Sequence, residues 1–178
     1  MKNGVITKHT PAQGGNTGDN TGDNTGDNTG DNTGDNTGDN TGVSTVLTTA
    51  PVVGTNYMLG MINTGAGSDV YYISGGMAAT YYLATSKNVA DAKMIGVEAA
   101  TGGFYLFMMN GSTKNYINVT ISGTHVNAVY GATASTVWTW DDTIKTLVTD
   151  VNGTPYALGT RSDRTFTTIG PVDTTRGS

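Results

Sequence analysis

The sequence predicts an all-β protein in which a compact C-terminal β domain follows an extended, repetitive shank. Residues 16–42 repeat one tetrapeptide, Asn-Thr-Gly-Asp, without a substitution and without an apolar side chain. Residues 56–172 instead carry about eleven short apolar runs separated by Gly and Asn, which is typical of a β-sandwich or barrel. We expect an N-terminal docking peptide at 1–15, a shank at 16–42, an extended lead-in at 43–55, a β-rich head at 56–172 and a polar tail at 173–178.

The N-terminal peptide contains a short apolar alternation around Val5 and Ile6, followed by Lys8 and His9. It is too short to fold alone, so we expect it to dock on a partner protein by strand addition. A frayed terminus is the alternative. We see no apolar core of a signal peptide and no run approaching the roughly 20 residues of a membrane span, so we expect no membrane partner.

The tetrapeptide repeat has no apolar residue to bury and cannot form a core. Gly at every fourth position excludes collagen, and Gly, Asn, Asp and Thr are poor helix formers. Two interpretations remain: a flexible polar linker, or a shank of several parallel copies paired through the backbone. We favour the multimeric shank. Parallel copies would place carboxylates side by side, so we hypothesise bound cations at Asp19, Asp23, Asp27, Asp31, Asp35 and Asp39.

Charge and composition exclude several classes of function. The net charge is −5, but six of the 14 acidic residues lie in the repeat, which leaves eight to face nine Lys and Arg. A nearly neutral remainder argues against a nucleic-acid surface. Cys is absent, which excludes a disulfide framework and thiol chemistry.

No catalytic motif is present. The chain contains no Gly-x-Ser-x-Gly elbow, no phosphate-binding loop and no His-Glu-x-x-His pair. Asp141 and Asp142 are adjacent, and adjacent strand residues point to opposite faces, so they cannot easily act together as acid and base. We therefore expect no enzymatic activity and no cofactor.

Three turn signals divide the head into hairpins of similar length: Gly75-Gly76, Asn110-Gly111 and Asn152-Gly153. Three hairpin units resemble a β-trefoil, and residues 140–159 resemble a ricin-type lectin unit. The Gln-x-Trp signature of that family is absent, because Gln13 is the chain's only Gln. A trimeric jelly-roll knob is the alternative fold.

Candidate carbohydrate contacts come from the aromatic residues of the head. Trp138 and Trp140 share one strand face, and the default is that both lie in the core. An exposed Trp beside Asp141 would instead offer a stacking surface and a hydrogen-bonding acid, which sugars need. We also consider Tyr72 and Tyr82, each from an adjacent Tyr pair, and Asn152 in its turn.

The small N-terminal peptide, the invariant polar repeat and the Gly-, Thr- and Asn-rich β head together resemble the short trimeric fibres that decorate bacteriophage heads or tails. This resemblance implies a structural virion protein, assembled in the host cytoplasm as a homotrimer. It also implies attachment to a capsid or tail protein through Val5, Ile6, Lys8 and His9, and a distal head that binds host glycans. The alternative is a secreted or cell-surface lectin-like module on a flexible polar stalk.

Overall fold

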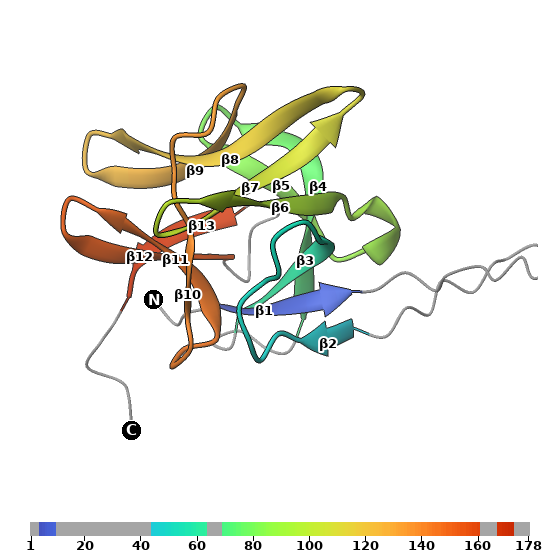
Figure 1. Ribbon diagram of the computed structural model, residues 1–178. Helices are drawn as coiled ribbons and strands as arrows, with labels where there is room; N and C mark the ends of the chain where they lie inside the picture. Colours follow the sequence, from blue (N-terminus) through green and yellow to red (C-terminus); the bar gives the residue numbers. More distant parts are fainter. Residues whose placement is uncertain (1–3, 10–43, 64–68, 161–166, 173–178) are drawn as a thin grey trace, which may run out of the picture.

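The computed structural model describes residues 4–9, 44–63, 69–160 and 167–172. Within these ranges the chain forms thirteen β-strands and one short 3-10 helix, η1 (Figure 1). Their bounds are β1 Gly4–His9, β2 Ser44–Val46, β3 Asn56–Asn63, β4 Val70–Ala79, β5 Tyr82–Ser86, η1 Val89–Asp91, β6 Met94–Ala100, β7 Gly103–Asn110, β8 Thr113–Ser122, β9 His125–Gly131, β10 Thr139–Asp141, β11 Thr146–Val151, β12 Thr154–Thr160 and β13 Thr167–Pro171.

The strands form two antiparallel sheets. The larger has nine strands, seven of them in the continuous order β2-β1-β3-β6-β7-β8-β9, with β4 and β5 branching from β3. The branch is possible because β1 pairs along one edge of β3, while β6 and β4 pair with the first and last parts of the other edge. The smaller sheet has the order β10-β11-β12-β13. The larger sheet curls towards a barrel, and the smaller sheet packs against β1, β3, β5 and β9 (Figure 1).

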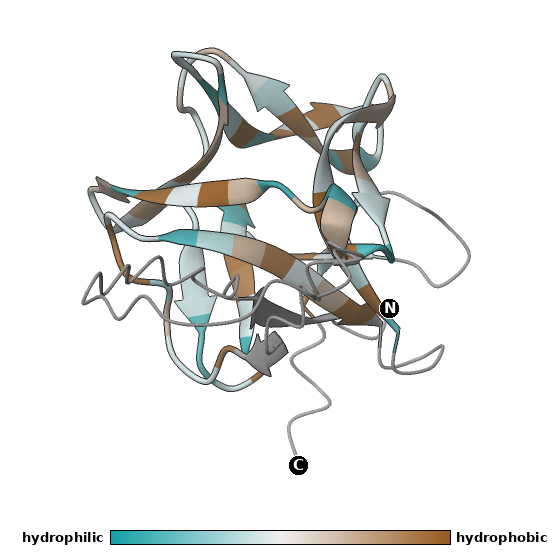
Figure 2. Cartoon of the chain, turned by 90° about the vertical axis from the view of Figure 1, so that its right-hand side faces the viewer, coloured by the Kyte–Doolittle hydropathy of each residue, from teal (hydrophilic) through white to brown (hydrophobic). Residues whose placement is uncertain are grey.

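Side-chain alternation explains why these segments form strands with one inward face. In β7, buried Phe104 and Leu106 alternate with half-exposed Tyr105 and Phe107. Figure 2 shows such alternation as brown and teal bands along the strands. Inward side chains of both sheets form one core, and each fully buried Leu or Ile contributes roughly 1.5–3 kcal/mol. Its largest buried members are Trp138, Leu59, Met61, Ile73, Leu83, Ile95, Leu106, Ile117, Leu147 and Leu158.

Trp138 joins the two sheets where the chain passes from one to the other. Its main-chain N–H and C=O pair with Phe104 at 2.8 and 2.9 Å. Its indole N–H donates to the main-chain oxygen of Ile117 at 2.9 Å, and its side chain is fully buried. This approach requires glycine at position 103, because a Cβ there would overlap the Trp138 carbonyl oxygen.

The all-β prediction is confirmed, since the apolar runs between residues 56 and 172 overlap β3 to β13. The hairpins expected at both Asn-Gly pairs are also present, but in the β7–β8 hairpin Asn110 pairs with Thr113 and the two loop residues are Gly111 and Ser112. Asn152 and Gly153 form the two-residue β11–β12 turn with φ values of 54° and 81°. The expectation of a turn at Gly75-Gly76 was wrong. These glycines lie inside β4 where the register with β5 shifts, so they form a bulge.

The β-trefoil expectation is also wrong. A trefoil needs three equivalent hairpin units, whereas β6 to β9 run as one meander in the larger sheet and β10 to β13 as a second meander. The stretch that resembles a lectin unit lies in the second meander. The jelly-roll alternative does not describe this order either, because jelly rolls pair strands through Greek-key connections.

Strand β1 belongs to the sheet of the head. It lies between β2 and β3, and His9 at its end pairs with Ser44 at the start of β2 (Figure 1). The chain therefore leaves the sheet at His9 and returns beside it at Ser44, so the repeat is inserted between two paired strands. The repeat itself lies outside the described residues.

We predict that the head folds without the repeat. Replacement of residues 10–43 by Asn-Gly should give a direct β1–β2 hairpin. Because a shorter loop loses less entropy on closure, the free energy of unfolding should rise by roughly 2 kcal/mol. Chemical denaturation of the full and shortened chains measures this. Deletion of residues 1–43, which also removes β1, is the matched control and should abolish the cooperative transition. A shortened chain without cooperative unfolding would show that the head needs the repeat.

We also predict that Gly103→Ala strongly destabilises the protein, because the new methyl group would collide with the Trp138 carbonyl. The free energy of unfolding should fall by roughly 2–4 kcal/mol. Gly102→Ala is the control. Gly102 has a φ of 84° but open space around the position that a Cβ would occupy, so it reports backbone strain alone. That strain should amount to about 1–2 kcal/mol. Equal effects of the two changes would contradict the role assigned to the Phe104–Trp138 contact.

Candidate functional site

The residues proposed to bind carbohydrate do not form one site. Trp138 and Tyr72 are buried, with relative exposures of 0% and 6%, so neither offers a ring face to a ligand. Tyr82 is half-buried in β5. Trp140 packs against the core and Asn152 is exposed in the β11–β12 turn. Trp138 therefore lies in the core as expected by default, whereas Trp140 is only partly buried and packs against the core.

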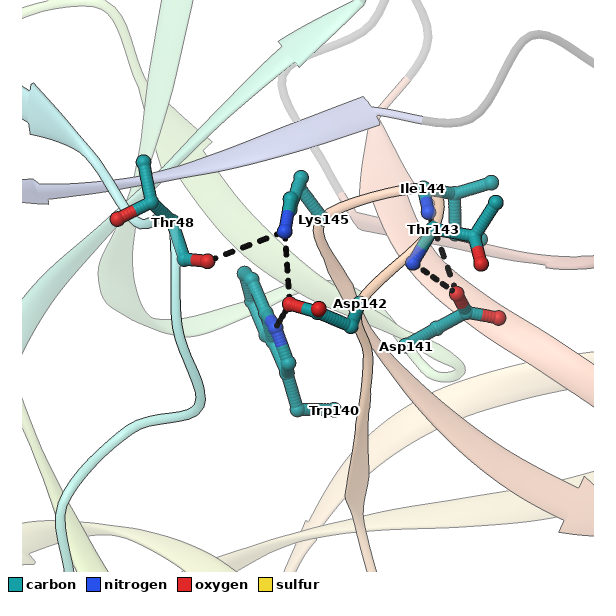
Figure 3. Close-up of polar contacts among 7 residues, drawn as sticks. All are labelled: Thr48, Trp140, Asp141, Asp142, Thr143, Ile144 and Lys145. Atoms are coloured by element: carbon teal, nitrogen blue, oxygen red, sulfur yellow. Dashed lines mark hydrogen bonds and ion pairs between the residues drawn. The ribbon is translucent and has the colours of Figure 1, made fainter. Parts of the chain in front are cut away.

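Trp140 and the two acids that follow it form a local polar network (Figure 3). The Trp140 indole N–H donates to Asp142 Oδ1 at 3.2 Å, and Lys145 Nζ donates to the same oxygen at 2.7 Å. Lys145 also donates to the main-chain oxygen of Thr48 at 3.2 Å. Asp141 Oδ1 instead accepts the N–H groups of the turn that follows it. The two carboxylates therefore make different structural contacts: Asp141 is the last residue of β10, whereas Asp142 lies in the turn that follows and not in the strand.

An aromatic cluster on the outer face of the larger sheet is similarly occupied by its own contacts. The Phe107 ring covers Gly96, where a Cβ would overlap the ring, and Lys114 Nζ lies 4.5 Å from the ring centroid. Glu98 accepts from Lys114 and from the Tyr116 hydroxyl. The hydrogen bond from Lys114 holds the pKa of Glu98 below its ordinary value. Because Phe107 packs over Gly96 and beneath the Lys114 ammonium group, the cluster is better suited to stabilising the sheet than to stacking a sugar.

Asn152 lines a hollow of ≈ 320 Å³ between the two sheets. Strand β8 contributes an aliphatic wall of Val119 and Ile121, and Ile121 is 51% exposed. The end of β11 and the turn after it also line the hollow, as does the crossing segment 135–137. The lining residues are Val119, Ile121, Ser135, Thr136, Val137, Thr149, Asp150, Val151 and Asn152.

The crossing segment is held in place by hydrogen bonds to β8. Asn118 Oδ1 accepts from the main-chain N–H groups of Ser135 and Thr136 at 2.9 and 3.2 Å. Thr136 Oγ1 accepts from the Val119 N–H at 2.7 Å, and Asn118 Nδ2 donates to the Thr133 oxygen. This wall of the hollow is therefore fixed by side chains that are themselves fully engaged.

Three polar groups at the hollow retain hydrogen-bonding capacity. Asp150 Oδ1 accepts from the Gly153 N–H at 2.9 Å, while its other oxygen has no partner among the described residues. Within the same part of the chain, the Ser135 hydroxyl and the Asn152 amide also have no hydrogen-bond partner. A carboxylate, an amide and a hydroxyl around an aliphatic surface can bind a molecule with both hydroxyl groups and an apolar C–H face.

Of the residues that line this hollow, the sequence analysis proposed only Asn152 as a ligand contact. Asp150 could also have been proposed from the sequence, since it lies two residues before Asn152, near the end of the preceding strand. No sequence pattern could have identified Ser135 and Ile121, because their proximity to the turn depends on how the second meander packs against β8.

The remaining predicted sites, the N-terminal attachment residues and the aspartates of the repeat, lie only partly within the described residues. The backbone of Val5, Ile6, Lys8 and His9 lies in β1, and the six repeat aspartates lie outside the described residues. In the part of the chain that is described, no group of three His, Asp or Glu side chains could hold a metal ion. Likewise, that part has no helix of the length and apolar character that crossing a membrane requires.

Comparisons with known proteins assign no relative. No family model matches the chain, and neither the curated proteins nor the solved structures contain a match.

We predict that Trp140 reports the titration of Asp142. The hydrogen bond from Lys145, followed by that from Trp140, lowers the pKa of Asp142 below its ordinary value of 3.8. Because the folded pKa is depressed, the network is complete above the ordinary value and is lost as pH falls through the folded value. Trp140 emission should therefore change with a midpoint below pH 3.8.

The matched comparison is Asp142→Asn against Asp69→Asn, which removes another exposed carboxylate that pairs with a lysine. The emission step should vanish in the first variant and persist in the second. A step that survives in Asp142→Asn would assign the titration to another group.

Proposed function

We propose that this chain is a structural, non-enzymatic fibre-type protein of a virus particle, whose β head binds neutral glycans of the host surface. The observation that carries the proposal is the hollow beside Asn152. Its carboxylate, amide and hydroxyl surround an aliphatic wall, and its volume of ≈ 320 Å³ accommodates a sugar unit. Asp150 favours neutral sugars over acidic ones, because a carboxylate repels an anion at close range.

The geometry of Asp150 suits a sugar particularly well. Its Oδ1 is fixed by the Gly153 N–H, so the carboxylate has a defined orientation and its second oxygen can accept from a hydroxyl group. The Asn152 amide can both donate and accept, which matches neighbouring sugar hydroxyls. Ile121 supplies exposed apolar surface for the C–H face of the ring.

Attachment to a capsid or tail protein by strand addition has a candidate position in β1. Strand β2 pairs with Thr7, Lys8 and His9, whereas no described strand pairs with Gly4 to Ile6 along that edge. An extended segment of a partner could therefore add beside Val5 and Ile6. This modifies the fibre plan, because the N-terminal strand is anchored in the head and the repeat is an insertion.

The pairing of β1 also favours a second candidate, a lectin-like module with an inserted polar segment. Sedimentation velocity of the full chain and of the chain lacking residues 10–43 distinguishes the two. A trimer that dissociates on excision, together with co-purification in a fixed ratio to a capsid component, supports the virion fibre and a multimeric shank. A monomer in both forms supports the module.

We predict that neutral oligosaccharides bind at the Asn152 hollow. A glycan array of the full chain selects the probe, and titration calorimetry measures its affinity for variants. Asp150→Asn retains an oxygen for the Gly153 N–H, and Asn152→Gly tolerates the positive φ of the turn, so both should fold. Asp150→Asn should weaken binding roughly tenfold or more, because a hydrogen bond to a charged group contributes about 1.5–3 kcal/mol. Asn152→Gly should weaken it roughly two- to tenfold, because a neutral hydrogen bond contributes about 0.5–1.5 kcal/mol.

Asp69→Asn is the control, since this exposed carboxylate pairs with Lys87 away from the hollow. Its affinity for the probe should equal that of the original chain. Unchanged binding by both hollow variants, or an array without any bound neutral glycan, would remove the receptor role from this site.

A further inference from the structure

A second hollow, of ≈ 490 Å³, lies beside the bulge of β4. Its walls come from the bulge, from the end of the β7–β8 hairpin, from Lys93 and from β9. The volume lies within the range of small-molecule sites. The residues that carry the argument are Lys93, Met108, Met109, Asn110, Asn115 and Tyr130.

The glycines of the bulge shape this hollow. Gly75 and Gly76 have φ values of 76° and 79°, which disfavour other residues. A Cβ on Gly75 would lie 3.0 Å from Lys93 Cγ and 3.2 Å from Met108 Sδ. The lysine stem and the methionine therefore lie directly against the β4 backbone, at the edge of the hollow.

Lys93 differs from the other lysines whose side chains are described. Lys87, Lys114 and Lys145 each pair with a carboxylate, whereas Lys93 has no such partner among the described residues. Its main-chain N–H donates to the Ile73 oxygen at 2.9 Å, which fixes the root of the side chain. An unpaired ammonium group at the edge of a hollow favours an anionic ligand.

The rest of the wall supplies hydrogen bonds and apolar contact. Among the described residues, the Tyr130 hydroxyl donates only to Met108 Sδ, at 3.9 Å, and a thioether is a weak acceptor. Burial raises the pKa of Tyr130 to about 12, so the hydroxyl stays protonated at neutral pH. Across the described chain, the Asn110 and Asn115 amides have no hydrogen-bond partner. Met109 is 49% exposed and offers a polarizable apolar surface.

We propose that this second hollow binds a saccharide that carries a carboxylate. Lys93 pairs with the carboxylate, and the two asparagine amides and the tyrosine hydroxyl bind the polar substituents of the ring. The methionines lie against its C–H face. The site is separate from the Asn152 hollow and prefers a ligand of opposite charge, because its charged side chain is Lys93, whereas that of the Asn152 hollow is Asp150.

The test is calorimetric titration of the full chain with N-acetylneuraminic acid and with glucuronic acid. At least one should bind, galactose should not compete with it, and affinity should fall as salt rises. Lys93→Gln should weaken binding roughly tenfold or more, because it removes a charge-assisted hydrogen bond. Lys87→Gln removes the same charge outside the hollow and should leave the affinity unchanged. Met109→Ala should weaken binding without changing the salt dependence.

Three results would overturn the proposal: binding of neither acid, equal binding by Lys93→Gln, or acetate binding as tightly as the sugar acids. The last result would mean that the hollow recognises charge alone. Asp150→Asn should leave acid binding intact. The two proposals can therefore fail separately. Absence of neutral-glycan binding with retained acid binding would contradict only the proposal for the Asn152 hollow, and absence of acid binding with retained neutral-glycan binding would contradict only the proposal for the second hollow.

Discussion

The contact between Trp138 and the larger sheet is the interaction on which the two-sheet arrangement depends. Two main-chain hydrogen bonds to Phe104 and one indole hydrogen bond to Ile117 tie the start of the second meander to β7 and β8. The indole is fully buried, so its N–H must find an acceptor inside the protein. This single residue therefore aligns the smaller sheet with the core face of the larger one, and Gly103 allows the close approach.

The hollow beside Asn152 is a consequence of that crossing. Once Trp138 is fixed, residues 135–137 must pass along β8, and Asn118 and Thr136 satisfy the polar backbone groups exposed by the passage. The hairpin of β11 and β12 then faces Val119 and Ile121 across the gap. Both meanders contribute side chains to the one core, so the walls of the hollow are held in place by that shared packing.

The sequence was informative about local structure and uninformative about distant contacts. The short apolar runs and the Asn152-Gly153 turn identified strands and a hairpin, because these patterns depend on neighbours along the chain. The same reasoning failed at Gly75-Gly76, since two glycines suit a bulge as well as a turn. The trefoil inference failed because similar hairpin spacing does not determine which strands pair. Lys93 and Tyr130 belong to one hollow only through tertiary packing, which no local pattern encodes.

The pairing of β1 with β2 changes what the tetrapeptide repeat can do. A spacer that joins a docking peptide to a head separates its two ends, whereas His9 and Ser44 are direct register partners. Any association of copies through the repeat must therefore accommodate an outgoing and a returning chain from each copy. The repeat contains no apolar side chain, so its insertion leaves no hydrophobic surface that the sheet would have to cover. Such an insertion can change in length with little effect on the core, because the energy that holds β1 resides in its pairing with β3 and β2.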